Sequence, residues 1–181
     1  MNKGKFIVIS GPSGVGKGTI VEQLKKLLPI HYSVSMTTRP PREGEQDKIN
    51  YYFVTKEEFQ KQIEQGNLLE YAIYNNNYYG TPKDKIEEKL NHGINVISEI
   101  EIQGALQIKK IYPEAVLIFI APPSIEELKK RLISRGTETK EKIEQRINIA
   151  KEELKQSIIY DHIITNYDVD VATEEIYDIL K

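Results

Sequence analysis

The run GPSGVGKGT at residues 11–19 has the residue types and spacing best suited to chemistry in this chain. It follows an apolar segment, 6–10, and precedes a segment with helical spacing, 20–28. Glycines let successive backbone N–H groups converge on an anion, and the N-terminus of the following helix adds partial positive charge. Lys17 supplies a mobile ammonium for terminal phosphates, so this order of elements predicts a P-loop that cradles a nucleotide.

The loop departs from the P-loop pattern at one position. Gly18 stands where Ser or Thr ordinarily holds the metal, and the hydroxyl comes one residue later, at Thr19. A glycine-rich turn without a ligand is the alternative, but the lysine at this spacing disfavours it. The expected nucleotide-binding residues are Ser13, Gly14, Val15, Gly16, Lys17, Gly18 and Thr19.

A P-loop alone is shared by motors, GTPases, transporters and kinases, so the arginines have to distinguish among these classes. They fall in two groups, Arg39 and Arg42 first, then Arg131, Arg135 and Arg146. Phosphoryl transfer needs fixed positive charge around the phosphates of both substrates. Two groups on two segments suit an enzyme that grips the acceptor with one and the donor with the other. Solvated surface charge is the alternative, weakest for Arg39 and Arg42, whose loop is stiffened by two prolines.

Three carboxylates stand at informative positions. Glu99 and Glu101 follow a predicted strand, where an acid commonly holds a nucleotide's metal, directly or through water; capping the next helix is the alternative. Glu70 lies within an apolar run and therefore needs a partner. A buried carboxylate suits a base that offers an N–H and an amino group on one edge, as guanine does.

The predicted strands are short, β-branched apolar runs at 6–9, 96–97, 116–120 and 162–165. Such runs are typical of parallel strands covered on both faces. Residues 51–54 indicate a further strand and 56–65 a short helix, while the asparagines at 75–77 indicate a turn.

Helical spacing separates the main strands. One predicted apolar face consists of Ile20, Val21, Leu24, Leu27 and Leu28, and another of Leu106, Ile108 and Ile111. Ser124 and Glu127 are spaced as an N-cap and its capping-box partner. Alternating strands and helices predict an α/β fold with a doubly wound parallel sheet.

Composition limits the alternatives. A chain of 181 residues with 39% hydrophobic and 29% charged residues suits a globular protein with one α/β domain. A net charge of −2 argues against broad binding to nucleic acid or to an anionic membrane. There is no cysteine and no apolar run of the roughly 20 residues that a membrane span needs, so we expect a cytoplasmic protein.

Five motifs together resemble the guanylate kinase family, in its compact bacterial form, over essentially the whole chain. They are SGPSGVGK (10–17), SVSMTTRPPREG (33–44), NYYGT (77–81), APPS (121–124) and RGTET (135–139). The resemblance implies one domain over 1–181, with a P-loop NTPase-type parallel sheet flanked by helices. Its core would cover about 1–32, 83–123 and 156–181, a small mixed α+β GMP-binding insertion about 33–82, and a helical lid about 124–155.

The resemblance also implies roles for individual residues. The GMP-site positions are Ser35, Arg39, Arg42, Tyr51, Glu70, Tyr79, Thr81 and Glu101. The two arginines and two tyrosines would hold the GMP phosphate, the two carboxylates would accept from the guanine N1–H and amino group, and the two hydroxyls would lie near the base. Lys17, Arg39, Arg131, Arg135 and Arg146 would act on the transferring phosphoryl group, and Asn166 would contact the adenine of ATP.

Four positions differ from the family's usual residues. Gly18 followed by Thr19 replaces Ser-Thr, in a form that adenylate kinases also use. Glu99 and Glu101 stand where other members carry Asp, and Thr81 keeps the hydroxyl of a usual Ser. Mg²⁺ is the implied cofactor, with Thr19 and Glu99 as its candidate ligands, directly or through water.

The implied reaction is ATP + GMP ⇌ ADP + GDP. The acceptor is a phosphate oxygen, already ionised near neutral pH because its second pKa is about 6, so no general base is assigned. A monophosphate kinase for another base is one alternative. A non-catalytic module of the same fold that binds phosphoproteins is another, disfavoured by the presence of Lys17 and the later arginines. ATP and GMP are the expected partners, and the sequence leaves the oligomeric state open.

Overall fold

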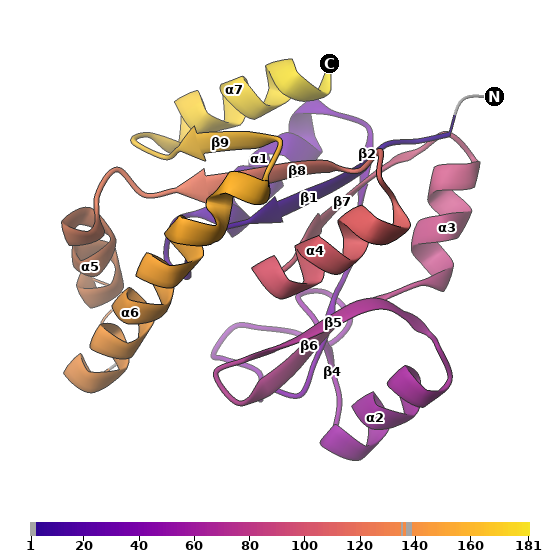
Figure 1. Cartoon of the computed structure of the whole chain (residues 1–181), viewed down its shortest axis with the longest axis horizontal. Coiled ribbons are helices and arrows are strands. Elements are labelled where there is room, and N and C mark those ends of the chain that lie inside the picture. The colour runs from indigo at the N-terminus through magenta and orange to yellow at the C-terminus, as the bar shows by residue number, and fades with distance from the viewer. Residues whose placement is uncertain (1–2, 135, 137–138) are drawn as a thin grey trace. The chain divides into compact units, whose positions relative to one another are not determined.

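The computed structural model of the chain describes residues 3–134, 136 and 139–181. It contains both helices and strands, which alternate singly over residues 77–134 (Figure 1). The strands are β1 (Phe6–Ser10), β2 (Ile30–Tyr32), β3 (Met36–Thr37), β4 (Tyr52–Phe53), β5 (Leu68–Tyr74), β6 (Asn77–Pro82), β7 (Asn95–Glu99), β8 (Val116–Ala121) and β9 (His162–Thr165). The helices are α1 (Lys17–Leu27), α2 (Lys56–Glu64), α3 (Asp84–Asn91), α4 (Ile102–Ile111), α5 (Ile125–Ser134), α6 (Lys140–Gln156), the 3₁₀ turn η1 (Ser157–Ile159) and α7 (Val169–Leu180).

Five strands form the main sheet, in the order β2-β7-β1-β8-β9. β2 pairs in parallel with β7, and β8 pairs in parallel with β9. All five residues of β1 are buried, as are the last five of β8, because parallel strands carry apolar side chains on both faces. The predicted parallel sheet flanked by helices is therefore confirmed.

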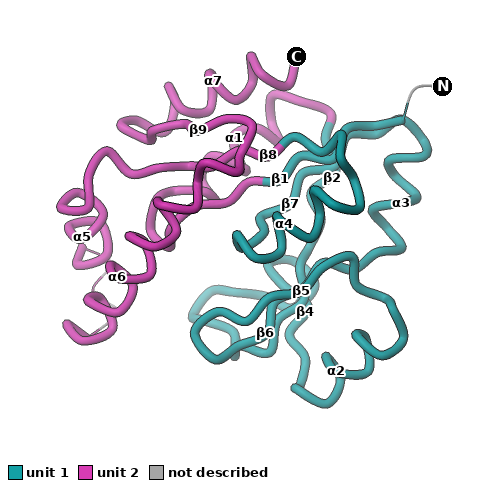
Figure 2. Tube along the Cα trace, viewed as in Figure 1, with its two compact units in different colours: residues 1–8, 30–116 teal, residues 9–29, 117–181 magenta. Residues whose placement is uncertain are grey.

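The chain divides into two compact units, described separately below (Figure 2). The first contains Ile30–Val116 and the described residues up to Val8, and the second contains Ile9–Pro29 and Leu117–Lys181. The boundary falls inside β1 and again inside β8, so both strands contribute to both units.

The first unit carries a small mixed sheet in the order β4-β3-β6-β5. β3 pairs in parallel with β4 and antiparallel with β6, and β6 pairs antiparallel with β5. The predicted turn at the asparagines closes the β5–β6 hairpin, with Asn75 and Asn76 at φ values of 49° and 62°. Asparagine is one of the few residues that adopt this left-handed conformation readily, as two-residue hairpin turns require. These strands lie within the predicted insertion, 33–82.

Helices of the first unit begin where the sequence provides a cap and pack by their apolar residues. Thr55 and Glu58 form a capping box at the start of α2, each side chain accepting from the other's backbone N–H. α3 packs against β7, and α4 packs against β5. Phe6 of β1 meets Tyr112 edge-on, with ring centroids 5.7 Å apart.

In the second unit, α7 packs against α1 and β9, and α5 packs against α6 (Figure 1). α5 and α6 lie in the predicted lid range, 124–155. Ser124 Oγ accepts from Glu127 N, as its predicted N-cap role requires. That 33–82 and 124–155 move as separate bodies stays a prediction.

Two predicted helix faces were partly wrong. α1 buries Ile20, Val21 and Leu24, but Leu27 in its last turn is 56% exposed. α4 buries Ile108 as predicted, whereas Leu106 and Ile111 are exposed and its buried face is completed by Ile102, Gly104 and Ala105. Spacing alone misplaced these faces because it could not show which turn of each helix is covered.

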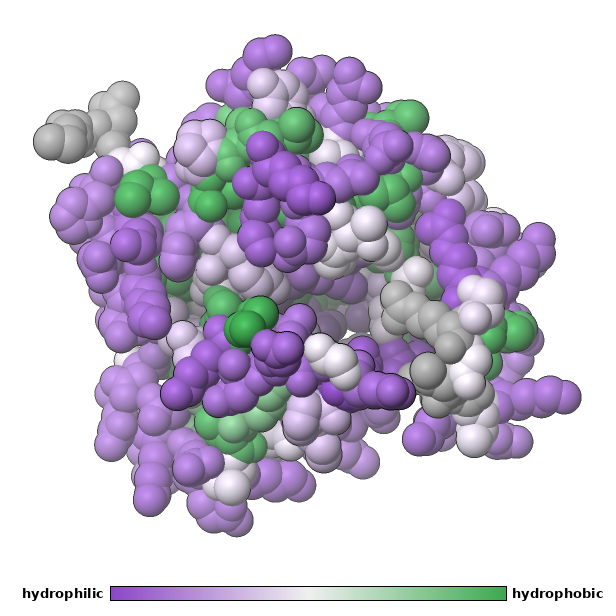
Figure 3. All heavy atoms as spheres, turned by 180° about the vertical axis from the view of Figure 1, so that it is seen from behind, coloured by the Kyte–Doolittle hydropathy of each residue, from purple (hydrophilic) through white to green (hydrophobic). Residues whose placement is uncertain are grey.

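The face of the molecule seen in Figure 3 is largely polar. Figure 3 shows one face on which hydrophobic residues occur in separate patches among hydrophilic ones. Within residues 3–134, 136 and 139–181, no helix combines the length and the hydropathy that crossing a bilayer requires.

Candidate active site

The predicted phosphate cradle lies in the second unit, between β1 and α1. Gly11, Gly14 and Gly16 have φ values of 145°, 89° and 104°, which turn the backbone back on itself. Gly16 is the N-cap of α1, and in the described part of the chain no side chain caps that end and no acid occupies the first turn. The first N–H groups of α1 and its positive dipole end are therefore available to an anion.

Lys17 folds back over this loop. Its Nζ donates to the carbonyl oxygens of Gly11 at 2.5 Å and Pro12 at 3.2 Å. The backbone of Lys17 begins α1, and its ammonium group reaches back to lie beside the loop. Both acceptors of these hydrogen bonds are neutral carbonyl oxygens, so neither competes as an anion with a phosphate ligand.

Residues from α5, α6 and the segment after β9 contact the same loop within the second unit. Arg146 donates to Ser13 Oγ, and Asn166 Nδ2 donates to Val15 O at 2.7 Å. Arg131 donates to Asn166 O at 3.0 Å. The structure therefore brings both arginines and Asn166 to the loop or its immediate neighbour. Arg135, the third predicted arginine, lies outside the described residues.

Asn166 occupies a structural position beside the loop. Its side chain is 1% exposed, and its Oδ1 has no hydrogen-bond partner among the described residues. Its amide nitrogen holds the loop, while the unpartnered oxygen is an acceptor that suits an amino group.

A buried carboxyl lies in the first unit, at the hairpin of β5 and β6. Glu70 is 4% exposed, and its Oε1 accepts from Thr81 Oγ1 at 2.5 Å across the paired strands. Burial raises the pKa of Glu70 to about 7, and the negative charge of Glu101 adds to the rise, while the Thr81 hydrogen bond opposes it. Glu70 and Thr81 thus meet as predicted.

The other predicted residues of the base site lie in the same unit. Glu101 is the N-cap of α4, and its charge acts on Glu70. Ser35 is buried directly before β3, and its carbonyl accepts from Tyr52 N at 2.9 Å. Carboxyl and hydroxyl groups therefore gather around the β5–β6 hairpin, where acceptors for a donor-rich base edge would be needed.

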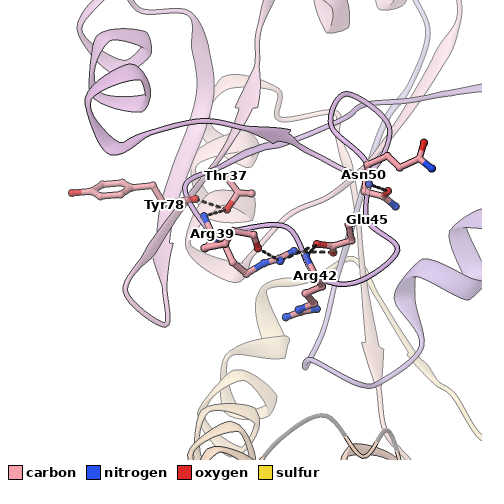
Figure 4. A network of polar contacts seen from close by, with 8 residues as sticks. Thr37, Arg39, Arg42, Glu45, Asn50 and Tyr78 are labelled. Carbon is pink, nitrogen blue, oxygen red and sulfur yellow. Dashed lines mark hydrogen bonds and ion pairs between the residues drawn. The ribbon is translucent and has the colours of Figure 1, made fainter.

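The predicted phosphate-binding arginine Arg39 is already paired with a carboxylate (Figure 4). Its NH1 and NH2 donate to Glu45 Oε2 and Oε1 at 2.9 and 2.8 Å, and Arg42 N donates to Glu45 Oε2 at 2.7 Å. Burial opposes ionisation of Glu45, but its hydrogen bonds from Arg39 and Arg42 lower its pKa. Sequence reasoning missed Glu45, although its place three residues after Arg42 was a usable signal.

Two tyrosines stand beside this ion pair. The rings of Tyr51 and Tyr79 lie 6.0 Å apart, and the Arg39 guanidinium lies 5.4 Å from the centre of the Tyr51 ring. Burial, with the nearby charge of Glu99, raises the pKa of Tyr51, so its hydroxyl stays a neutral donor. The cationic and tyrosine donors predicted for a phosphate are therefore close neighbours.

The candidate metal ligands belong to different units. Glu99 ends β7 in the first unit, where Tyr32 donates to its Oε1 at 3.3 Å. Thr19 lies exposed in the first turn of α1 in the second unit. Among the described residues, no three His, Cys, Asp or Glu side chains gather as a metal site.

A P-loop lysine on a parallel α/β sheet, with arginines at the loop, defines a P-loop nucleotide-binding protein. A family model described as guanylate kinase matches residues 3–181. A guanylate kinase from Clostridioides difficile (strain 630) is 52% identical over 182 residues, covering 100% of this chain and 89% of that protein. One from Shouchella clausii (strain KSM-K16) is 50% identical over 175 residues, covering 96% and 85%.

A solved structure agrees with these relatives. The crystal structure of guanylate kinase from Anaplasma phagocytophilum matches with a TM-score of 0.85 at 33% identity, covering 99% of this chain and 85% of that one. This chain belongs to the guanylate kinase family. The resemblance found in the five sequence motifs is confirmed.

Proposed function

We infer that this chain transfers the terminal phosphoryl group of ATP to GMP, giving ADP and GDP. The observation that supports this most is a family match over residues 3–181 in a chain that has both Lys17 at a bare helix N-terminus and the buried Glu70. The first feature suits a donor triphosphate, and the second suits the donor edge of guanine.

ATP is assigned to the loop of the second unit. Backbone N–H groups of Ser13–Thr19 and the ammonium of Lys17 would bind its phosphates, and Arg131, Arg135 and Arg146 would neutralise charge that develops during transfer. The unpartnered Oδ1 of Asn166 suits the amino group of adenine.

GMP is assigned to the first unit. Glu70 and Glu101 would accept from the guanine N1–H and amino group, with the hydroxyls of Ser35 and Thr81 nearby. Arg39, Arg42, Tyr51 and Tyr79 would hold the phosphate. Arg39 Nε is buried without a hydrogen-bond partner among the described residues, so this donor stays available while NH1 donates to Glu45 and Pro40 O and NH2 donates to Glu45.

Mg²⁺ fits the donor groups present. Mg²⁺ is commonly bound by one or two protein oxygens together with substrate phosphates and water. Thr19 and Glu99 would hold it, directly or through water. When bound, the ion neutralises charge on the phosphates. Because ATP and GMP are metabolites of the cytoplasm, we place the activity there.

The chain's own residues supply alignment and charge. The attacking oxygen belongs to a phosphate that is largely ionised at neutral pH, so no side chain has to remove a proton. Lys17 and the arginines would orient the reacting groups and stabilise the charge on the transferring phosphoryl group.

The test is ADP release from ATP and Mg²⁺ with GMP, AMP, dTMP, CMP or no acceptor. Turnover with GMP alone supports the proposal and its base assignment together. Turnover with AMP or dTMP instead would retain phosphoryl transfer and overturn the assignment of Glu70. No turnover with any acceptor, from folded protein that still binds GMP, would support the non-catalytic binding module.

A further inference from the structure

Residue 104 is a glycine whose missing side chain leaves room for a carboxyl group. Gly104 is buried in α4, and its backbone lies against Glu70 of β5. A Cβ built on Gly104 would overlap Glu70 Oε2, and it would lie 2.7 Å from Glu70 Cδ and 2.6 Å from Ile100 Cγ2. Packed Cβ atoms do not show such separations, so a side chain here would displace the carboxyl.

The backbone conformation of Gly104 does not itself require glycine. Its φ is outside the left-handed region that only glycine adopts easily. Glycine in a helix interior is less favourable than alanine, because it loses more conformational freedom on folding. The close approach of Glu70 is therefore the feature of this site that accounts for glycine.

Gly104 lies between two other residues, the N-cap Glu101 and Gln107 of α4, that also act on β5. Glu101, one turn earlier, acts electrostatically on Glu70. Gln107, one turn later, forms hydrogen bonds with the backbone of Tyr71, which follows Glu70 in β5. Gln107 Nε2 donates to Tyr71 O at 2.7 Å, and Tyr71 N donates to Gln107 Oε1 at 3.4 Å. Residues three positions apart share a helix face, so Glu101, Gly104 and Gln107 together set how close β5 comes to α4.

We propose that Gly104 is a positioning residue for acceptor recognition: by having no side chain, it sets where the Glu70 carboxylate stands beside Glu101 and thereby determines preference for guanine. This deepens the proposed function and rests on it. A methyl group at position 104 moves the carboxylate away from α4 and strains its contact with Thr81. The carboxylate then no longer stands where the guanine N1–H and amino group would reach it.

The experiment compares the unmodified chain with Gly104→Ala, Glu70→Asp and the double variant. The readouts are kcat and the KM values for GMP and ATP, together with the preference for GMP over inosine monophosphate, whose base lacks the 2-amino group. We expect Gly104→Ala to raise the GMP KM at least tenfold, to reduce that preference, and to leave the ATP KM within twofold. Gln103→Ala, an exposed neighbour on α4, is the matched control and should change none of these.

The double variant tests the physical cause. Aspartate is one methylene shorter and leaves room for the new methyl group. The rise in the GMP KM of the double variant should therefore be smaller than the product of the rises in the two single variants. Losses that simply multiply would overturn the proposal, as would a GMP KM for Gly104→Ala within twofold of the unmodified chain. An equal rise in the ATP KM would also overturn it, since a general structural fault would act on both substrates.

Two further outcomes are informative. If Gly104→Ala does not fold, folding of the double variant would support the proposal, and failure of both to fold would overturn it. If the unmodified chain shows no turnover with GMP, the proposed function fails on its own. The proposal is then read from calorimetric titration with GMP, where an unchanged Kd in Gly104→Ala contradicts it and a tenfold weaker Kd supports it.

Discussion

Glu70 carries an ionisable carboxyl group at a place where its charged form is poorly solvated. Burial raises its pKa from the ordinary 4.5 to about 7, so between these two values the folded chain keeps a proton that the unfolded chain has lost. Stability falls with rising pH wherever the folded state binds more protons. Raising the pH through this window therefore removes stability, and the protein is expected to be more stable on the acid side with respect to this group.

We predict that Glu70→Gln removes this pH dependence. The unmodified chain should lose about 2–3 kcal/mol relative to the variant between pH 5 and pH 8, since each pKa unit corresponds to about 1.4 kcal/mol and nearly two pKa units of the rise lie within this window. Urea unfolding of both proteins at the two pH values measures the difference. If the free energies of unfolding of the two proteins differ by the same amount at pH 5 and pH 8, Glu70 is not the source of this pH dependence.

Lys17 is predicted to act in transfer rather than in acceptor binding. Lys17→Ala removes the ammonium held at the loop and should lower kcat by about 10²–10³-fold, the typical cost of losing one charge-stabilising donor. The GMP KM should change by less than about threefold. Steady-state kinetics in both substrates measures this, with Lys26→Ala, exposed on the same helix, as the control. Equal losses in kcat and GMP affinity would refute this division of roles.

The ion pair of Arg39 and Glu45 predicts a separation of stability from activity. Arg39→Ala leaves a half-buried carboxylate without its partner and should destabilise the fold by about 1–2 kcal/mol. Adding Glu45→Gln removes the uncompensated charge and should restore the stability, while kcat/KM for GMP stays low. Thermal unfolding and kinetics of the unmodified chain and the two variants provide the check; recovery of activity along with stability would make Arg39 a structural residue only.

At the scale of elements, the side chain of Gln107 makes hydrogen bonds with the edge of β5 of the kind that a neighbouring strand would make. β5 ends the small sheet, and exposed strand edges recruit other strands. The Gln107 amide donates to and accepts from Tyr71, as a neighbouring strand would. The helix thereby protects the edge of the strand that carries Glu70.

We predict that Gln107→Ala destabilises the protein by about 1–2 kcal/mol, from the loss of its two hydrogen bonds with Tyr71 and one to Gln103 O, and increases its association at high concentration. Urea unfolding and light scattering measure the two effects, and Gln103→Ala serves as the control on the same helix. Unchanged stability, with light scattering equal to that of the control, would show that the hydrogen bonds between Gln107 and Tyr71 do not protect the edge of β5.

Local signals in the sequence predicted four of the five strands of the main sheet but not β2, β5, β6 or α3, and contacts between distant residues explain the features of the site that it missed. The loop at 11–19, the turn at Asn75, the helix at 56–65 and the cap of α5 depend on residues a few positions apart. Gly104 and Gln107 matter because of residues more than thirty positions away, which no local pattern reveals. Glu70 was predicted only because a carboxyl within an apolar run needs a partner.

At the scale of the whole molecule, the two units cannot be separated along the chain. The chain passes from one unit to the other within β1, after Pro29 and within β8. Neither unit is a continuous segment, and two strands belong to both. We therefore expect both units to unfold together in one cooperative transition.

We therefore predict that GMP, although assigned to the first unit, slows hydrogen exchange in β9 of the second. A ligand that binds only the folded state, present at 100 times its Kd, adds about 2.7 kcal/mol to the free energy of unfolding. Amides of β9 that exchange by global unfolding should slow accordingly. Protection confined to residues 30–116 would show that the units unfold independently.

The assignment of acceptor and donor sites to different units has an evolutionary consequence. Every described residue assigned to the guanine base lies within residues 30–116, and every described residue assigned to bind ATP at the P-loop lies outside that range, whereas Arg39, expected to act on the transferring phosphoryl group, lies within it. Substitutions that change which base is accepted therefore fall in segments that do not include the P-loop. Selection can alter the choice of nucleotide acceptor while the machinery that grips the phosphoryl donor is inherited unchanged.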